Sequence, residues 1–164
     1  MYMLDTNIII DFIGERGPDL KETRLLLLAG RVGEFSLWIS SSQVTDMTYM
    51  FDGCRNLTSI DVSHFNTSQV TKMMRMFGYC TSMNTLYLGS FNTARVEQFY
   101  GMFVGCANLT TIYVGEEWTT AAATSHDDMF LNCTSLVGGK GTTYDENHVD
   151  AAYAHIDGGV DNPG

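Results

Sequence analysis

The chain has 164 residues, of which 45% are apolar, and its formal net charge at pH 7 is −10. This length fits one domain or two small units built around a hydrophobic core. Only 9 residues are Lys or Arg and no apolar run reaches about 18 residues, which argues against a phosphate-binding nucleic-acid surface and predicts no membrane span.

The first 46 residues alternate between predicted strands and helices. An apolar strand in MYMLDTNIII is followed by a helix in DLKETRLLLLAG, a strand in FSLWIS and the start of a helix in SSQVTDM. This order is typical of an α/β unit. The N-terminus lacks the basic residues and the cleavage site of a secretory signal peptide, which favours a cytoplasmic location.

The segments LDTNIIIDF and WISSSQVTDM resemble the first third of a PIN domain, the fold of VapC-type toxin ribonucleases. The resemblance implies that Asp5 and Asp46 are catalytic carboxylates that bind Mg²⁺ or Mn²⁺, with the metal activating water to cleave RNA. The C-terminal half that supplies this family's further acids is replaced here by the repeats described below, so such an activity would be crippled. From the residues alone, Asp5 is also explained as a turn residue that caps the next helix and Asp46 as a solvent-facing helical residue.

From about residue 44 the sequence repeats with a period of 26 or 27 residues, marked by Cys54, Cys80, Cys106 and Cys133. A Met-Phe pair begins four residues before each Cys, and Leu or Met follows three residues after it. A period of this length is typical of a solenoid. The repeats begin near residues 44, 70, 96 and 123, and the predicted array covers residues 44–138.

Each repeat has two predicted halves. The first half, as in VTKMMRMFGYC, has the apolar spacing of three and four residues that favours a short helix. The second half, as in LTSIDVSHF, has the alternating pattern of a leucine-rich-repeat strand. We therefore expect an α/β fold: a short leucine-rich-repeat solenoid with a parallel strand ladder and convex helices, capped by the partial PIN-like segment at residues 1–46.

The four cysteines should lie in one column, because equivalent residues of neighbouring repeats are about 5 Å apart. We expect buried structural thiols that pack like small apolar residues. Disulfides between adjacent cysteines are an alternative at that spacing. A metal site is a further alternative, although a straight column cannot surround zinc tetrahedrally.

The repeat VTDMTYMFDGCRNLTSIDVSHFNTSQ and the two that follow resemble the repeat of BspA-type leucine-rich-repeat proteins of bacteria, and the tail resembles the end of such arrays. The resemblance covers about residues 44–164. It implies a cell-surface or secreted protein with a binding or adhesion function and no enzymatic activity. Because the signal peptide is lacking, the location stays open between the surface and the cytoplasm.

The strand positions between the predicted core residues should form one open face. Asp61, Tyr87 and Tyr113 occupy equivalent positions in three repeats, so they should lie side by side. Aromatic residues on such a face can anchor a partner, and solenoids present extended binding surfaces of this kind. We therefore predict that a protein or glycan binds there. Alternatively, the tyrosines are present because Tyr favours strands.

Residues 139–164 form a Gly- and Asp-rich tail, for which we expect a solvated, partly disordered structure. No cofactor is expected beyond the Mg²⁺ or Mn²⁺ of the nuclease alternative, and RNA is a partner only under that alternative. A third possibility is a chimeric or truncated fragment without a function of its own, because an open last repeat leaves an unpaired strand edge.

Overall fold

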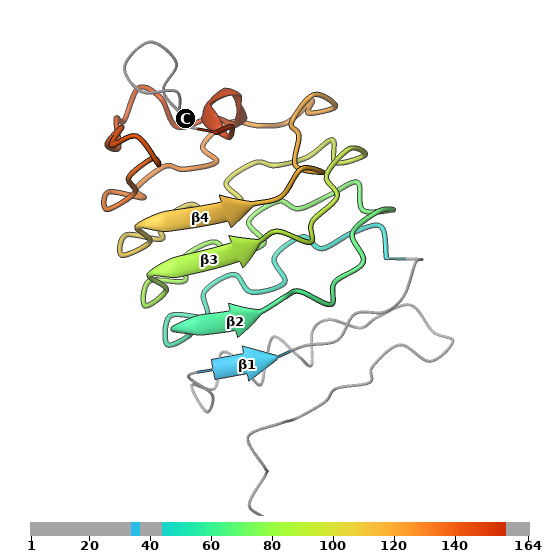
Figure 1. Ribbon diagram of the computed structural model, residues 1–164, viewed down its shortest axis with the longest axis horizontal. Coiled ribbons are helices and arrows are strands. Elements are labelled where there is room, and N and C mark those ends of the chain that lie inside the picture. The colour runs from blue at the N-terminus through green and yellow to red at the C-terminus, as the bar shows by residue number, and fades with distance from the viewer. Residues whose placement is uncertain (1–33, 37–43, 157–164) are drawn as a thin grey trace, which may run out of the picture.

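The computed structural model describes residues 34–36 and 44–156, and in these the chain runs through a series of stacked coils (Figure 1). The regular elements are β1 (Glu34–Ser36), β2 (Ser59–Asp61), β3 (Thr85–Leu88), β4 (Thr111–Val114) and the short 3-10 helix η1 (Ala151–Tyr153). Asp5 and the elements predicted before residue 34 lie outside the described residues.

The strands lie one above the other in chain order and point the same way (Figure 1). β1 pairs in parallel with β2, with Glu34 opposite Ser59, and β3 pairs in parallel with β4, with Thr85 opposite Thr111. Parallel neighbours need a long crossover connection. Here the first half of each repeat supplies that connection, so each repeat completes one coil.

The convex helices predicted for the first half of each repeat are corrected by the structure to consecutive turns. The N–H groups of Met47 and Phe51 donate to the carbonyls of Lys72 and Met76 in the next coil, at 2.9 and 2.8 Å. Tyr49 also donates to the next coil, whereas the N–H groups of the alternate residues bond locally, as that of Cys54 does to the carbonyl of residue 51, three positions back, at 3.1 Å. In an α-helix, each of these N–H groups would donate to the carbonyl four residues earlier in the same segment.

Each of these segments contains two residues with left-handed backbone, four positions apart, and these residues explain why the segment does not form a helix. In the first coil, Tyr49 has φ 60° and Gly53 has φ 76°. The same conformation recurs in the later coils at Arg75, Tyr79, Gly101, Gly105, Asp128 and Asn132. One left-handed residue interrupts a right-handed helix. The apolar spacing of three and four residues therefore comes from successive turns that each direct one side chain inward.

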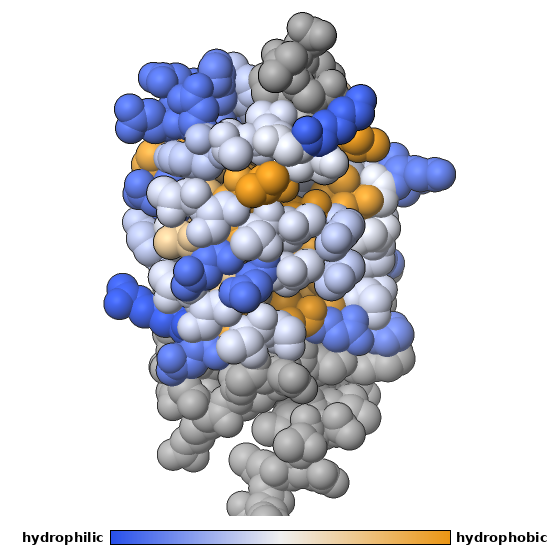
Figure 2. All heavy atoms as spheres, turned by 60° about the vertical axis from the view of Figure 1, so that its left-hand side comes forward, coloured by the Kyte–Doolittle hydropathy of each residue, from blue (hydrophilic) through white to orange (hydrophobic). Residues whose placement is uncertain are grey.

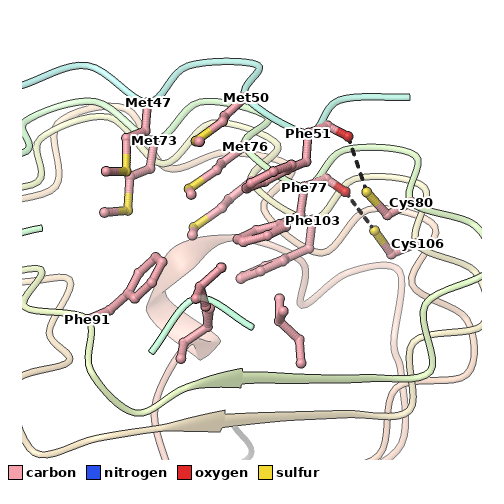
Figure 3. Close-up of a cluster of buried hydrophobic side chains, with 14 of the residues drawn as sticks. Met47, Met50, Phe51, Met73, Met76, Phe77, Cys80, Phe91, Phe103 and Cys106 are labelled. Atoms are coloured by element: carbon pink, nitrogen blue, oxygen red, sulfur yellow. Dashed lines mark hydrogen bonds between the residues drawn. The ribbon is translucent and has the colours of Figure 1, made fainter. Parts of the chain in front are cut away.

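The core consists of ladders of equivalent apolar side chains, several of them identical from coil to coil (Figure 3). The rings of Phe51, Phe77, Phe103 and Phe130 stack in sequence with centroids 5.3, 6.0 and 5.7 Å apart. Fully buried methionines accompany them, with Met47 beside Met73 and Met50 beside Met76 in Figure 3. Because each coil presents an apolar side chain at the same place, the apolar positions of the repeat stack into one continuous core.

Most side chains of residues 139–148 are exposed, as expected for a solvated tail, but residues 149–154 pack against the last coil. The Phe130 N–H donates to the carbonyl of Val149 at 2.7 Å, where equivalent phenylalanines donate to the next coil. The indole Nε1–H of Trp118 donates to the carbonyl of Ala154 at 2.9 Å. The tail thus replaces the missing coil on the turn side and caps the array.

Within residues 34–36 and 44–156 the structure contains no helix with the length and hydrophobicity needed to cross a membrane.

Candidate functional site

The outward side chains of β2, β3 and β4 form the strand face, which we define by Asp61, Tyr87 and Tyr113. The strands alternate, so that Ile60 and Leu86 point into the core while these three residues are exposed. Tyr87 and Tyr113 are 63% and 51% exposed, and their rings stack 4.8 Å apart with an angle of 9° between planes. Tyr87 and Tyr113 are directly opposed in the β3–β4 register. The parallel ladder therefore presents two aligned aromatic rings to solvent.

Asp61 carries a fixed negative charge at the last position of β2. Its Oδ1 accepts a hydrogen bond from the Ser63 N–H at 2.9 Å. Hydrogen bonding from Ser63, through both its side chain and its backbone, holds the pKa of Asp61 below its ordinary value. Hydrogen bonds to the charged form favour that form. Asp61 is therefore an ionised carboxylate at neutral pH, one coil away from Tyr87.

A glycine follows each tyrosine by two positions, directly after the end of β3 and of β4. A Cβ added at Gly89 would meet no atom within 4 Å, whereas a Cβ at Gly115 would lie 2.2 Å from the Gly89 carbonyl oxygen. The two coils therefore approach each other closely beside the rings. In Figure 2, which turns the left-hand side of Figure 1 forward, residues of intermediate hydropathy mix with hydrophilic ones, and the hydrophobic areas are small.

Asp46, the metal ligand implied by the PIN resemblance, has a structural role in the repeat. Its Oδ1 accepts from the Thr48 N–H at 2.9 Å, and its Oδ2 lies 3.7 Å from the Lys72 Nζ. A parallel β-bridge joins the backbone of Asp46 to that of Lys72, and further parallel bridges join Lys72 to Gln98 and Gln98 to Ser125. Among the residues that the structure describes, no group of three or more His, Cys, Asp or Glu side chains is placed to hold a metal ion.

The cysteine column is buried, and no disulfide joins the four residues, all of which lie in the described part of the chain. The thiols of Cys80, Cys106 and Cys133 donate to the carbonyls of the phenylalanines at positions 51, 77 and 103, at 3.2, 3.0 and 3.0 Å. Figure 3 shows the first two of these bonds. Burial raises the pKa of Cys106 to about 12, and it raises the pKa values of Cys80 and Cys133 as well. Thiols in this environment are poor nucleophiles.

A cluster on the turn side, which sequence reasoning missed, holds an arginine between two tyrosines. The Arg75 guanidinium carbon lies 5.4 Å from the ring centroid of Tyr49 and 5.0 Å from that of Tyr79. Its Nη2 is 3.1 Å from Oδ1 of the buried Asp52. The period itself was the available signal, because Tyr49 and Arg75 are 26 residues apart and share one column.

A cavity of about 270 Å³ beside β4 was also missed. Its lining includes Tyr113, Trp118, Val137 and Ile156. The chain leaves the strand ladder here, because Val137 bridges antiparallel to Thr143 instead of starting a strand beside β4. The glycines in LVGGKGTT, which stand where earlier repeats have strand residues, were the signal for this departure.

The coil geometry defines a repeat protein whose successive units pair backbone to backbone. The chain belongs to the family described as "Mycoplasma protein of unknown function, DUF285", whose model matches residues 32–144. No curated protein matches the chain, and no solved structure matches it.

The family match begins at residue 32 and includes β1 and Asp46. β1 pairs with β2 as β3 pairs with β4, so residues 34–36 belong to the strand ladder. The PIN-like assignment therefore has no support at β1 or at Asp46.

Proposed function

We propose that this chain is a non-enzymatic binding module of a bacterial surface protein. In this proposal the coils form a short leucine-rich-repeat solenoid, and the strand face engages a protein or glycan partner. The single observation that carries the proposal is the exposed, stacked pair Tyr87 and Tyr113 on a regular strand ladder. The resemblance to BspA-type repeats supports a surface or adhesion context.

Tyr87 and Tyr113 have two properties that favour binding, a large contact area and a fixed orientation. Tyrosine supplies a large contact area with few rotatable bonds, so little side-chain freedom is lost on binding. The stacking of the two rings and the ladder beneath them fix their orientation before a partner arrives. Pre-organised groups lower the entropic cost of association. Aromatic residues of this kind are enriched among those that dominate binding energy.

The test is binding of the Tyr87→Ser, Tyr113→Ser double variant to an array of immobilised oligosaccharides and to a panel of purified proteins, measured by surface plasmon resonance. We expect the affinity for any specific partner to fall at least about tenfold, the loss typical of removing an aromatic anchor. Tyr100→Ser is the matched control, because Tyr100 is 41% exposed and lies in the turn half of its coil. Equal binding by the double variant and the wild type would exclude the strand face as the binding surface.

A further inference from the structure

We infer that the strand face selects a cationic partner: a basic protein segment whose Arg or Lys side chains lie on the rings of Tyr87 and Tyr113 and beside Asp61. This inference rests on the proposed function and specifies its ligand. It assigns a chemical class that the family description leaves open.

Cations occur on the turn half of the coils, and no Lys or Arg stands at the outward positions of β2, β3 and β4. On the turn half, Lys72 pairs with Asp46, and Arg75 pairs with Asp52. The outward positions in the strands and directly after them are Ser59, Asp61, Ser63, Thr85, Tyr87, Gly89, Thr111, Tyr113 and Gly115, which include an acid and no Lys or Arg. The strand face thus offers negative charge and aromatic rings, and the basic group that acts on Asp61 is His64.

The protein already uses the same set of groups to hold a cation. Arg75 lies over the rings of Tyr49 and Tyr79 and pairs with Asp52. The strand face presents two tyrosines and one aspartate as well, at equivalent positions in three successive coils about 5 Å apart. Because Tyr87 and Tyr113 stack on each other, a guanidinium or ammonium group of a partner would lie on the outer face of a ring, not between the two rings as Arg75 does.

The chemistry favours a charged partner over a neutral sugar. The face of a tyrosine ring carries negative potential and attracts cations, more strongly where water is partly excluded. Asp61 adds a full negative charge that hydrogen bonding from Ser63 keeps ionised. The net charge of −10 draws cations toward the whole molecule and raises their encounter rate. A neutral glycan would gain nothing from either charge term.

The experiment measures binding of an acetylated, amidated peptide of alternating Arg and Gly by fluorescence polarisation, with a citrulline peptide as its neutral counterpart. We expect the arginine peptide to bind at least about tenfold more tightly than the citrulline peptide. Tyr87→Leu with Tyr113→Leu keeps apolar area but removes the ring faces, and should weaken arginine binding about five- to tenfold. Asp61→Asn should weaken it about threefold or more.

Matched variants separate this site from general attraction to an acidic protein. Asp127→Asn removes the same charge from a side chain that is 79% exposed away from the strand face, and should change affinity less than about twofold. Circular dichroism and thermal melting of each variant should match the wild type, because the substituted side chains are exposed.

Four outcomes would overturn the inference. Equal binding of the citrulline peptide would show that the cationic charge of the ligand does not matter. An equal effect of Asp127→Asn and Asp61→Asn, or undiminished binding by the leucine double variant, would show that the net charge of the protein alone attracts the peptide. Tyrosine-dependent binding of a neutral oligosaccharide without arginine binding would overturn the cationic ligand and leave the proposed function intact. If the tyrosines affect no binding in either assay, the proposed function fails as well.

Discussion

At the scale of single residues, the buried thiols link the stability of the protein to pH. Cys106 donates to the Phe77 carbonyl inside the core, and burial raises its pKa to about 12. An unfolded cysteine has a pKa of about 8.5. Between these two values the unfolded chain loses the proton and the folded chain keeps it. The stability is therefore fully present below about pH 8.5 and declines as pH rises toward the folded pKa.

This linkage predicts a difference between the wild type and Cys106→Ala in alkaline solution. Each such thiol should lower the free energy of unfolding by about 1.4 kcal/mol per pH unit in that window. Between pH 8 and pH 10 the wild type should therefore lose about 2 kcal/mol more than Cys106→Ala. Urea unfolding at both pH values measures the two losses. Identical losses would mean that Cys106 ionises as readily in the folded chain as in the unfolded one.

The same scale shows what a single sequence can predict about a site. The equivalent positions of Asp61, Tyr87 and Tyr113 followed from the period, because a residue 26 positions later lies one coil higher. The cluster around Arg75 did not follow, because it depends on left-handed backbone at Tyr49, Arg75 and Tyr79. Residues with bulky side chains seldom adopt that conformation, so the 26-residue spacing of Tyr49 and Arg75 indicates a shared column but not the contact between the side chains.

At the scale of the elements, close packing of consecutive coils makes two equivalent glycines differ. Gly115→Ala would place a Cβ 2.2 Å from the carbonyl oxygen of Gly89, which is backbone and cannot rotate away. We expect this substitution to lower the free energy of unfolding by about 2 kcal/mol, within the range for overpacking. Chemical denaturation monitored by circular dichroism measures the change.

Gly89→Ala is the matched control for that substitution. The two glycines are 26 residues apart and occupy the same place in consecutive coils, but a Cβ at Gly89 meets no atom within 4 Å. Alanine there should leave stability unchanged or raise it by up to about 1 kcal/mol, because it restricts the unfolded chain. Equal effects at both positions would contradict the close approach of the two coils beside the rings.

The elements also show where sequence patterns lose their meaning. The alternation in SIDV and TLYL predicted strands at places where the structure has β2 and β3. The spacing of three and four residues predicted helices, and the structure has turns. Both arrangements place every third or fourth side chain inward, so periodicity alone cannot separate them. The deciding factor was hydrogen bonding to the next coil, as from Met47 to Lys72, which a single repeat does not contain.

At the scale of the whole molecule, the tail closes the end of the array. The carbonyl of Val149 accepts from Phe130, and the Ala151 N–H donates to the carbonyl of His126 at 3.1 Å. These contacts have no period, which is why the sequence predicted a solvated tail instead. Terminal repeats of a stacked protein need such a cover to hide their apolar edge.

Ending the chain after Tyr144 should therefore destabilise the whole array. The truncation removes Val149 and Ala151, which pack against the core, and leaves the Phe130 N–H without its acceptor. We expect a lower and broader thermal transition together with self-association, since exposed edges pair with other chains. Differential scanning calorimetry and size-exclusion chromatography detect the two effects. An unchanged melt with a monomeric profile would show that the tail contributes nothing to closure.

The alternation of backbone bonds in the turns has a mechanical consequence. Because every second N–H is committed to the neighbouring coil, each coil is held by its own set of bonds and by its own ring of the phenylalanine ladder. A molecule anchored at one end and pulled at the other would yield by peeling, one coil per event. Each event would release 26 residues and lengthen the chain by about 90 Å. The array would therefore dissipate an applied force in steps.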